Sequence, residues 1–317
     1  MPVNLDKPQL WKADIALSVD MYNDWFMKFA PVAIRETRLK TTRDVEDTLQ
    51  KTKNLTDIKA EILREHPGVL PTLRMSTCPP IAVDRLVGLA GVSKNLVGRM
   101  EVGTLPARMA AAAMQADLER IGSIIEQMAD PDIFVWLEAN RTAAVAEVHR
   151  AATIVADRLC GAVANPIIRN AQERRQLAAI GGWLERRGYK RLPEGIKYNA
   201  MSTGTYSFRL NVLVKAEGSR ATVNLPVDTA VMPHKANAGE LPFMIEAKSA
   251  GDFTNTNKRR KEEAHKINQL RHTFGHGVRF VLFLCGYFDG GYLGYEAAEG
   301  IDWVWEHRID DLAQFGI

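Results

Sequence analysis

The feature that most constrains this chain is a short strand pattern that carries two charged residues on one face. The run Phe243-Met244-Ile245-Glu246-Ala247-Lys248 alternates with a period of two, so a strand places Glu246 and Lys248 on the same side. A second strand pattern, Asn224-Leu225-Pro226-Val227-Asp228, precedes it across a short polar loop and contains another carboxylate. The sequence therefore predicts a sheet in which two acidic residues and a lysine lie close together.

These three side chains suit the hydrolysis of phosphodiester bonds. Asp228 and Glu246 offer hard oxygen ligands for Mg²⁺, which binds one or two carboxylates together with waters and a phosphate oxygen. Lys248 adds a positive charge that can orient an attacking water, help to deprotonate it, or offset charge in the transition state. A surface hairpin with an ordinary Glu/Lys pair has the same spacing, so the spacing alone leaves both interpretations open.

The segments around this strand predict an order of helix, three strands, helix and strand. Their ranges in chain order are 165–187 for a helix opened by Asn165-Pro166, 205–214, 221–231 and 243–248 for strands, 257–274 for a charged helix, and 278–285 for a strand. Gly275 is expected to end the charged helix. The last strand is almost wholly apolar, as is typical of a strand buried on both faces.

With this element order, the acid and lysine motifs resemble those of the PD-(D/E)XK nuclease superfamily. Longer words resemble type II restriction endonucleases of the XamI family. These words are NAQERRQL (170–177), SAGDFTNTNKRRKEE (249–263), LCGYF (284–288), GIDWVWEHR (300–308) and LRMSTCPP (73–80). The resemblance spans nearly the whole chain, and its long words are more specific than the three charged residues.

The resemblance implies a role for each residue of the motif. Asp228 and Glu246 would be ligands of Mg²⁺, Lys248 would be the catalytic lysine, and Glu173 would be the first-helix glutamate that supports the metal site. One residue separates the proline from Asp228, whereas the superfamily's name has these two residues adjacent. Because a proline side chain binds no metal, this departure leaves the expected ligands unchanged.

The resemblance also implies an activity and its partners. The favoured function is a Mg²⁺-dependent type II restriction endonuclease that acts as a homodimer on a specific double-stranded DNA palindrome of the GTCGAC type, with a DNA methyltransferase as its functional counterpart. One alternative is a structure-specific nuclease of DNA repair or recombination, which would use the same three residues. Another is a non-catalytic helix-turn-helix DNA-binding regulator, against which the intact set of acids and lysine argues.

Positive charge is concentrated in the helix that follows the Lys248 strand. Residues 257–271 contain six basic and two acidic side chains, whereas the whole chain carries a net charge of only +3. The candidates for DNA contact here are Asn255, Asn257, Lys258, Arg259, Arg260 and Lys261. Basic residues in this position can hold a DNA backbone beside the metal. The alternatives are a helix cap at Asn257 and a solvated face with pairs such as Arg259/Glu263.

The first half of the chain is predicted to be helical, and it contains a second candidate for DNA contact. Residues 84–101 are similar to a helix-turn-helix, in which Gly91 suits the turn and Ser93 can cap the second helix. The side chains left exposed would be Lys94, Asn95 and Arg99. Lys and Arg suit guanine or phosphate, and Asn suits adenine. Such a helix pair is as often a scaffold, so both roles remain open.

Composition limits the remaining possibilities. Three widely spaced cysteines, Cys78, Cys160 and Cys285, encode no disulfide framework or zinc site. We expect a cytoplasmic protein without a membrane partner, because neither a signal sequence nor an apolar run of transmembrane length stands out. The 317 residues allow two domains. We predict an α+β protein with a helical domain at 1–164, which contains the helix-turn-helix-like segment, and a PD-(D/E)XK α/β nuclease domain at 165–317.

Overall fold

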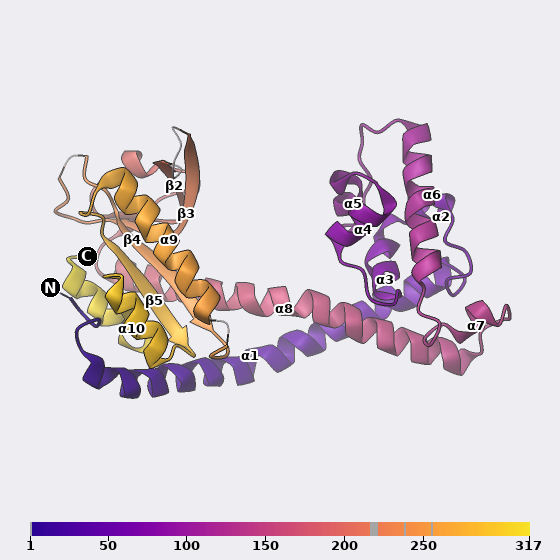
Figure 1. Ribbon diagram of the computed structural model, residues 1–317, viewed down its shortest axis with the longest axis horizontal. Helices are drawn as coiled ribbons and strands as arrows, with labels where there is room; N and C mark the ends of the chain where they lie inside the picture. Colours follow the sequence, from indigo (N-terminus) through magenta and orange to yellow (C-terminus); the bar gives the residue numbers. More distant parts are fainter. Residues whose placement is uncertain (1, 216–220, 238, 255) are drawn as a thin grey trace. The chain divides into compact units, whose positions relative to one another are not determined.

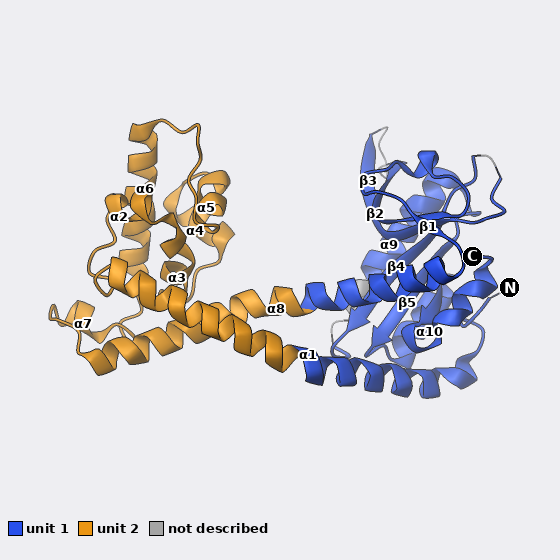
Figure 2. Cartoon of the chain, turned by 180° about the vertical axis from the view of Figure 1, so that it is seen from behind, with its two compact units in different colours: residues 1–29, 169–317 blue, residues 30–168 orange. Residues whose placement is uncertain are grey.

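The computed structural model has a mixed α+β architecture, with helices in the N-terminal part and a six-stranded sheet in the C-terminal part (Figure 1). It describes residues 2–215, 221–237, 239–254 and 256–317, and it leaves out the side chains of 256–259. The chain forms two compact units, residues 1–29 with 169–317, and residues 30–168 (Figure 2). The boundary predicted at residue 164 places the first 29 residues in the helical domain, whereas in the structure they belong to the unit that contains the sheet.

The helical unit consists of parts of two long helices and the short helices between them. The bounds are α1 (Pro8–Lys51), α2 (Ala60–Glu65), η1 (Pro67–Val69), α3 (Leu70–Met75), α4 (Val83–Ala90), α5 (Lys94–Met100), α6 (Ala111–Met128), α7 (Val135–Glu138) and α8 (Val145–Arg186). Leu63, Leu86 and Ile121 are fully buried in its core. A partly buried ion pair, Arg74 Nη2 to Glu101 Oε2 at 2.6 Å, joins α3 to the end of α5. Arg74 belongs to a sequence word that resembles the XamI family, and its place here is structural.

Helices α4 and α5 form a helix pair at the predicted position. Gly91 lies between them in a left-handed conformation (φ +61°), which a glycine adopts without steric cost. The Ser93 hydroxyl accepts a hydrogen bond from Leu96 N at 3.1 Å and so caps α5, as predicted. Lys94, Asn95 and Arg99 are exposed. The local geometry therefore matches the expected helix pair, and its role in DNA contact stays a prediction.

The strands of the sheet lie side by side in the order in which they occur along the chain. They are β1 (Lys190–Arg191), β2 (Thr205–Lys215), β3 (Thr222–Met232), β4 (Phe243–Ala250), β5 (Phe280–Gly286) and β6 (Asp302–Trp305). β2, β3 and β4 are antiparallel, β1 is parallel to β2, and β4, β5 and β6 are parallel to one another. The helical elements of this unit besides α1 and α8 are η2 (Tyr198–Ala200), α9 (Thr256–Phe274), α10 (Gly290–Ala298) and η3 (Glu306–Phe315).

Each face of the sheet buries its own hydrophobic core. Leu282 and Leu284 of β5 pack in the core that includes Ile267 of α9, and the alternate residue Phe283 packs in the core that includes Ile180 of α8. Every residue of β5 is buried, which confirms the predicted strand with two covered faces. The catalytic candidates therefore lie on a sheet that is held between helices.

Two predictions about the helices differ from the structure. Helix α8 does not open at Asn165-Pro166 but begins at Val145 and continues through Pro166. A proline removes one backbone hydrogen bond from a helix interior, and this loss is local because the helical turns on either side of Pro166 continue. By length and composition, α8 is apolar enough to cross a membrane, whereas the sequence predicts no segment of this kind. Core helices of soluble proteins pass the same test.

The N-terminal segment is fixed to β6 by the carboxylate of Asp302. This group accepts hydrogen bonds from the backbone N–H groups of Val3, Asn4 and Leu5 at 2.5, 3.0 and 3.1 Å. Farther along, the Ser18 hydroxyl of α1 accepts a hydrogen bond from Gly286 N at 2.8 Å. These contacts explain why the first 29 residues belong to the unit of the sheet.

A buried pair of carboxyl groups lies where α9 meets α10. Glu263 is 1% exposed and accepts a hydrogen bond from the Tyr292 hydroxyl at 2.5 Å, and Glu296 is fully buried. The Glu296 carboxyl group forms a side-chain hydrogen bond with the Glu263 carboxyl group. Burial, followed by repulsion from Glu263, raises the pKa of Glu296 to about 9. Glu296 is therefore protonated at neutral pH.

We expect Glu296→Gln to reduce the loss of stability at high pH. Ionising the wild-type carboxyl group opposes folding, because its pKa is higher in the folded protein than the ordinary value of 4.5. This cost is absent below about pH 4.5, grows as the pH rises, and is complete above about pH 9. Urea unfolding at several pH values should show the variant gaining on the wild type with rising pH. A constant difference between the two would contradict the assignment.

A second expectation concerns the helix pair. Leu96→Ala should lower the free energy of unfolding by about 2–5 kcal/mol, because Leu96 is fully buried and its removal leaves a cavity. Asn95→Ala, an exposed change in the same turn, should alter it by no more than about 0.5 kcal/mol. Denaturant titration of both variants measures the difference. Equal effects would mean that α5 does not pack as described.

Candidate active site

The sheet brings together the two acids and the lysine predicted from the sequence. Thr229 of β3 pairs with Ile245 of β4, so Asp228 lies beside the segment that carries Glu246 and Lys248. The Asp228 Oδ2 atom accepts a hydrogen bond from Ala247 N at 2.8 Å, between those two residues. The β3–β4 pairing therefore fixes the distance between the acids without help from a loop.

Glu246 is the centre of this group of charges. Its side chain is 5% exposed, and its Oε1 atom lies 3.0 Å from Lys248 Nζ and 2.6 Å from Lys266 Nζ. Its Oε2 atom is buried and has no hydrogen-bond partner in the described part of the chain. One oxygen thus carries two ammonium contacts, and the other is available to a further cation or donor.

Lys248 is held between two carboxylates. Its Nζ lies 3.0 Å from Glu246 Oε1 and 3.8 Å from Glu263 Oε1. Burial alone would lower the pKa of Lys248, but attraction to Glu246 and Glu263 outweighs burial and raises it. The lysine is therefore a cation here, which suits electrostatic stabilisation of a phosphate group.

The pKa of Asp228 is raised by its burial and by the negative charge of Glu246. Burial and then repulsion from Glu246 raise the pKa of Asp228 to about 6, although Lys248 and the hydrogen bond from Ala247 N oppose this shift. Two carboxylates that are partly buried side by side repel each other, and a bound cation would reduce this repulsion. The two acids thus favour the binding of a positive ion.

Helix α8 borders the site with the residues of its NAQERRQL word. Gln176 Nε2 donates to Lys248 O and Phe283 O, both at 3.3 Å, and Gln172 donates to the Ser249 hydroxyl. Glu173 and Asp228 line the same cleft of about 300 Å³, which also includes Glu246 and Lys248. Helix α8 therefore positions the backbone of β4, and it brings Glu173 to the cleft.

Three residues of the site were not predicted from the sequence. Lys266 of α9 contacts Glu246, and its Nζ also donates to Pro226 O at 2.8 Å. Glu263 approaches Lys248 from the same helix, and Arg209 of β2 pairs with Glu173, Nη2 to Oε1 at 2.9 Å. From the sequence, Lys266 is one of several basic residues of the helix at 257–274. Only the packing of α9 against β4 brings it to its partner, Glu246.

The ligand set fits a hard divalent cation. Among the described residues there is no group of three or more His, Cys, Asp or Glu side chains arranged to hold a metal ion. Mg²⁺ needs only one or two carboxylates, since waters and phosphate oxygens supply its other ligands. Asp228 and the unpartnered Glu246 Oε2 can provide these two carboxylates.

The predicted DNA-binding residues are found in different surroundings. Lys261 is exposed, whereas Arg260 is half-buried with its guanidinium 4.4 Å from the centre of the Tyr295 ring. Asn255 and the side chains of Asn257, Lys258 and Arg259 lie outside the described residues. Glu263, the expected acid of a solvated Arg259/Glu263 pair, is buried, and the pair itself lies outside the described residues. Lys94 pairs with Asp84 at 2.9 Å, and this α4–α5 pair belongs to the helical unit.

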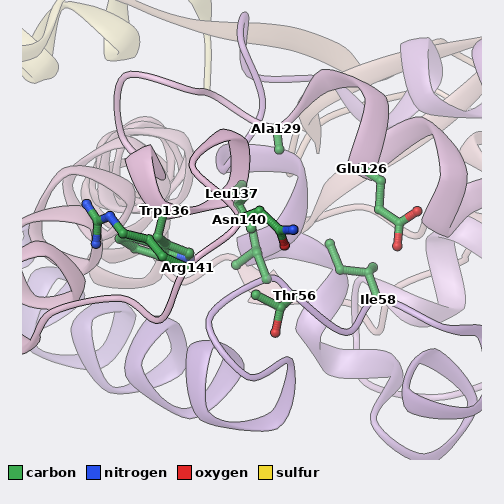
Figure 3. A pocket seen from close by; sticks show the side chains of 9 residues that line it. Thr56, Ile58, Glu126, Ala129, Trp136, Leu137, Asn140 and Arg141 are labelled. Atoms are coloured by element: carbon green, nitrogen blue, oxygen red, sulfur yellow. The ribbon is translucent and has the colours of Figure 1, made fainter.

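The helical unit also contains a cavity of about 320 Å³ (Figure 3). Its lining includes Ile58, Glu126, Trp136 and Arg141, and none of the residues proposed for catalysis or DNA contact is among them. The Trp136 indole donates to the backbone carbonyl of Asn54 at 2.9 Å, which ties α7 to the end of α1. This cavity is therefore separate from the group of charges on the sheet.

Comparison with known proteins agrees with the chemistry of this site. Residues 53–305 match the family described as XamI restriction endonuclease. The chain is 53% identical over 316 residues to the type II restriction enzyme SalI of Streptomyces albus G, with 99% of each chain covered. No solved structure matches the chain. Of the three functions considered from the sequence, these matches support the first: the chain belongs to the XamI restriction endonuclease family and is a type II site-specific deoxyribonuclease.

Proposed function

We propose that this endonuclease cleaves both strands of a palindromic DNA site in a Mg²⁺-dependent reaction at the Asp228–Glu246–Lys248 group. The observation that carries the proposal is the buried Glu246 Oε2, which lacks a hydrogen-bond partner among the described residues and lies in the same cleft as Asp228. A buried anionic oxygen without a partner is costly, and a metal ion would remove that cost. Mg²⁺ would polarise the phosphate and lower the pKa of a bound water.

The protein's own groups have distinct tasks in this proposal. Asp228 and Glu246 hold the ion, and Lys248 presents its ammonium to the attacking water or to the charge that develops on the phosphate. Lys266 shares the Glu246 Oε1 atom with Lys248, so it keeps this carboxylate in place and lowers the local negative charge. Glu173 supports the site from α8 through its ion pair with Arg209.

The fold supports a PD-(D/E)XK core in this unit. The order α8, β2, β3, β4, α9 and β5 follows the helix, three strands, helix and strand of the sequence prediction. The two acids and the lysine lie on the two central antiparallel strands, β3 and β4. We therefore propose that the α/β unit is a nuclease core of this superfamily, with α8 as its first helix.

Binding of DNA is proposed for the start of α9 and, as a second candidate, for α5. Lys261 is exposed next to the cleft that Glu262 lines, so it can contact a phosphate near the scissile bond. Lys258 and Arg259 precede it in sequence. In α5 the exposed Asn95 and Arg99 would face a major groove if the α4–α5 pair acts as a helix-turn-helix.

The remaining proposals follow from the expected substrate. A two-fold symmetric homodimer would match a two-fold symmetric site, and the resemblance makes a GTCGAC-type sequence the first to test. A DNA methyltransferase would protect the same site in the host. The proposed location is the cytoplasm.

Cleavage of a plasmid that contains GTCGAC tests the proposal. The wild type should give discrete fragments with Mg²⁺ and none with EDTA, and sequencing the fragment ends defines the recognition site and the cut. Asp228→Ala, Glu246→Ala and Lys248→Ala should each lower the cleavage rate by about 10²–10⁴-fold, because each removes a metal ligand or an electrostatic group. Binding to the cognate duplex in Ca²⁺ should survive in all three.

Two outcomes would contradict the assignment. Near wild-type cleavage by any of the three variants would remove that residue from the centre. A variant that loses cognate binding in Ca²⁺ together with cleavage would have a fault in folding or in DNA contact. Glu173→Ala should have a milder effect on the rate, since Glu173 acts through Arg209.

The contact between Lys266 and Glu246 leads to a prediction that does not follow from the sequence motif. Lys266→Met should lower the cleavage rate by about 10²-fold or more while cognate binding in Ca²⁺ persists, because Glu246 loses the ammonium 2.6 Å from its Oε1. Lys266→Arg, which keeps the charge, should retain more activity. Lys12→Met, at an exposed lysine of the same unit, is the matched control. Equal rates for Lys266→Met and Lys12→Met would mean that Lys266 has no part in catalysis.

A further inference from the structure

The two faces of the β2–β3 hairpin differ in chemistry. On one face Val212, Val214 and Val227 are buried in the core that includes Ile267 of α9. The other face alternates with it and is exposed on β2, where it presents Arg209, Asn211, Leu213 and Lys215. On β3 this second face continues with Asn224, Pro226 and Asp228. The proposed metal ligand Asp228 is therefore the inner end of a polar strip along the hairpin.

The outer part of this hairpin is a two-stranded ribbon. β3 pairs with β2 over nearly its whole length, but it pairs with β4 only from Thr229 to Val231. Residues 209–215 and 222–228 thus extend beyond the β3–β4 pairing, with α9 covering their apolar face. A ribbon of two strands is one of the elements that the major groove of B-DNA can admit.

A cavity of about 270 Å³ lies on the polar face of the ribbon, between it and residues 195–199. Its polar lining consists mainly of the amides of Asn199, Asn211 and Asn224 and the cations Lys197 and Arg209, and no acidic side chain lines it. The catalytic cleft, in contrast, is lined by four acidic residues. The charge of the ribbon face therefore complements DNA, and its amides offer paired donors and acceptors.

Arg209 connects this cavity with the catalytic cleft. It lines the cavity and forms an ion pair with Glu173, which lines the cleft. It lies opposite Asp228 in the strand register, between the pairs Phe208↔Thr229 and Leu210↔Val227. Its φ of +51° is a left-handed conformation that residues other than glycine adopt rarely and at an energetic cost, and such strain is concentrated at functional sites.

We propose that the polar face of the β2–β3 hairpin enters the major groove of the target DNA, with Asn211 and Asn224 reading base edges and Arg209 contacting the backbone beside the cut bond. This inference rests on the proposed centre at Asp228. The Asn side chain can donate to and accept from one adenine at the same time, which gives discrimination between bases. Both amides are exposed and make no hydrogen bond to other described residues.

The spacing along the strand fits a short recognition site. Asn224 precedes Asp228 by four residues on β3, which corresponds to about 13 Å in an extended strand. Successive phosphates of one DNA strand advance by about 3.4 Å along the helix axis, so this length covers about four base steps. A base within a short palindrome therefore lies within reach of Asn224 when the cut bond lies at the metal site.

Competition binding in Ca²⁺ tests the proposal without requiring cleavage. The cognate duplex is the one defined by sequencing wild-type cleavage products, and a scrambled duplex of equal length is the competitor. Asn211→Ala and Asn224→Ala should each weaken cognate binding by about 5- to 150-fold, since each lost base contact removes discrimination, and should change scrambled binding by less than about twofold. Arg209→Gln should weaken both alike and reduce the salt slope by about 0.9.

The controls separate the possible readers of the site. Asn268→Ala, at an exposed position of α9 on the apolar side of the hairpin, should leave both affinities unchanged. Asn95→Ala and Arg99→Ala test α5. If these two lose the preference for the cognate duplex while both hairpin variants keep it, α5 reads the bases and the hairpin proposal fails. Unchanged specificity in Asn211→Ala, Asn224→Ala and their double variant also overturns it.

Failure of the proposed centre gives a different pattern. If the Asp228→Ala variant still cleaved DNA, the proposed metal site would be overturned. The binding comparison of the asparagine variants would remain valid in that case. Thermal unfolding of each variant excludes a folding defect, because an exposed Asn→Ala change should leave the melting temperature close to that of the wild type. Loss of cognate preference at an unchanged melting temperature supports base reading by the hairpin.

Discussion

The burial of Glu246 is the constraint on which the rest of this site depends. A carboxylate with 5% of its side chain exposed is costly unless cations compensate for the lost hydration, and two ammonium groups approach its Oε1 atom. Lys248 comes from the same strand, but Lys266 comes from α9 and also bonds to the backbone of β3 at Pro226. Charge compensation therefore joins β3, β4 and α9. The same helix places Glu263 near Lys248, so α9 balances both signs of charge.

Neutral hydrogen bonds from α8 hold β4 on the other face of the sheet. Gln176 of α8 donates to carbonyl groups of both β4 and β5, and Gln172 bonds to Ser249, so α8 is fixed to the strand pair directly behind Lys248. The Gln176 bonds go to backbone carbonyls and the Gln172 bond to the Ser249 hydroxyl, so none of them involves the charged side chains of the strand. Substitutions at Glu246 or Lys248 thus alter the charge of the site and leave this support in place.

The sequence predicted the parts of this structure that depend on local pattern. Alternation identified β4 and the common face of Glu246 and Lys248, and Gly275 marked the end of α9, where its φ is +85°. What the pattern could not give depends on packing between distant segments. Lys266 is one of many charged residues on α9 until the docking of that helix selects it, and Asp302 meets the N-terminal segment across nearly the whole chain. The metal ligands and the DNA-binding residues stay predictions that experiment must test.

Strand register links the chemistry of the site to the polar face of the hairpin. Side chains alternate along a strand, so a shift of one residue would turn every side chain of β3 to the other face. The register that holds Asp228 in the cleft is therefore the one that exposes Asn224 and Asn211, and the same shift would bury these amides and expose Val227. The burial of Val212, Val214 and Val227 against α9 stabilises this register, in which the polar side chains stay on the exposed face. The hydrophobic core beneath the hairpin thus fixes where Asp228, the proposed metal ligand, lies and which side chains face outward beside it.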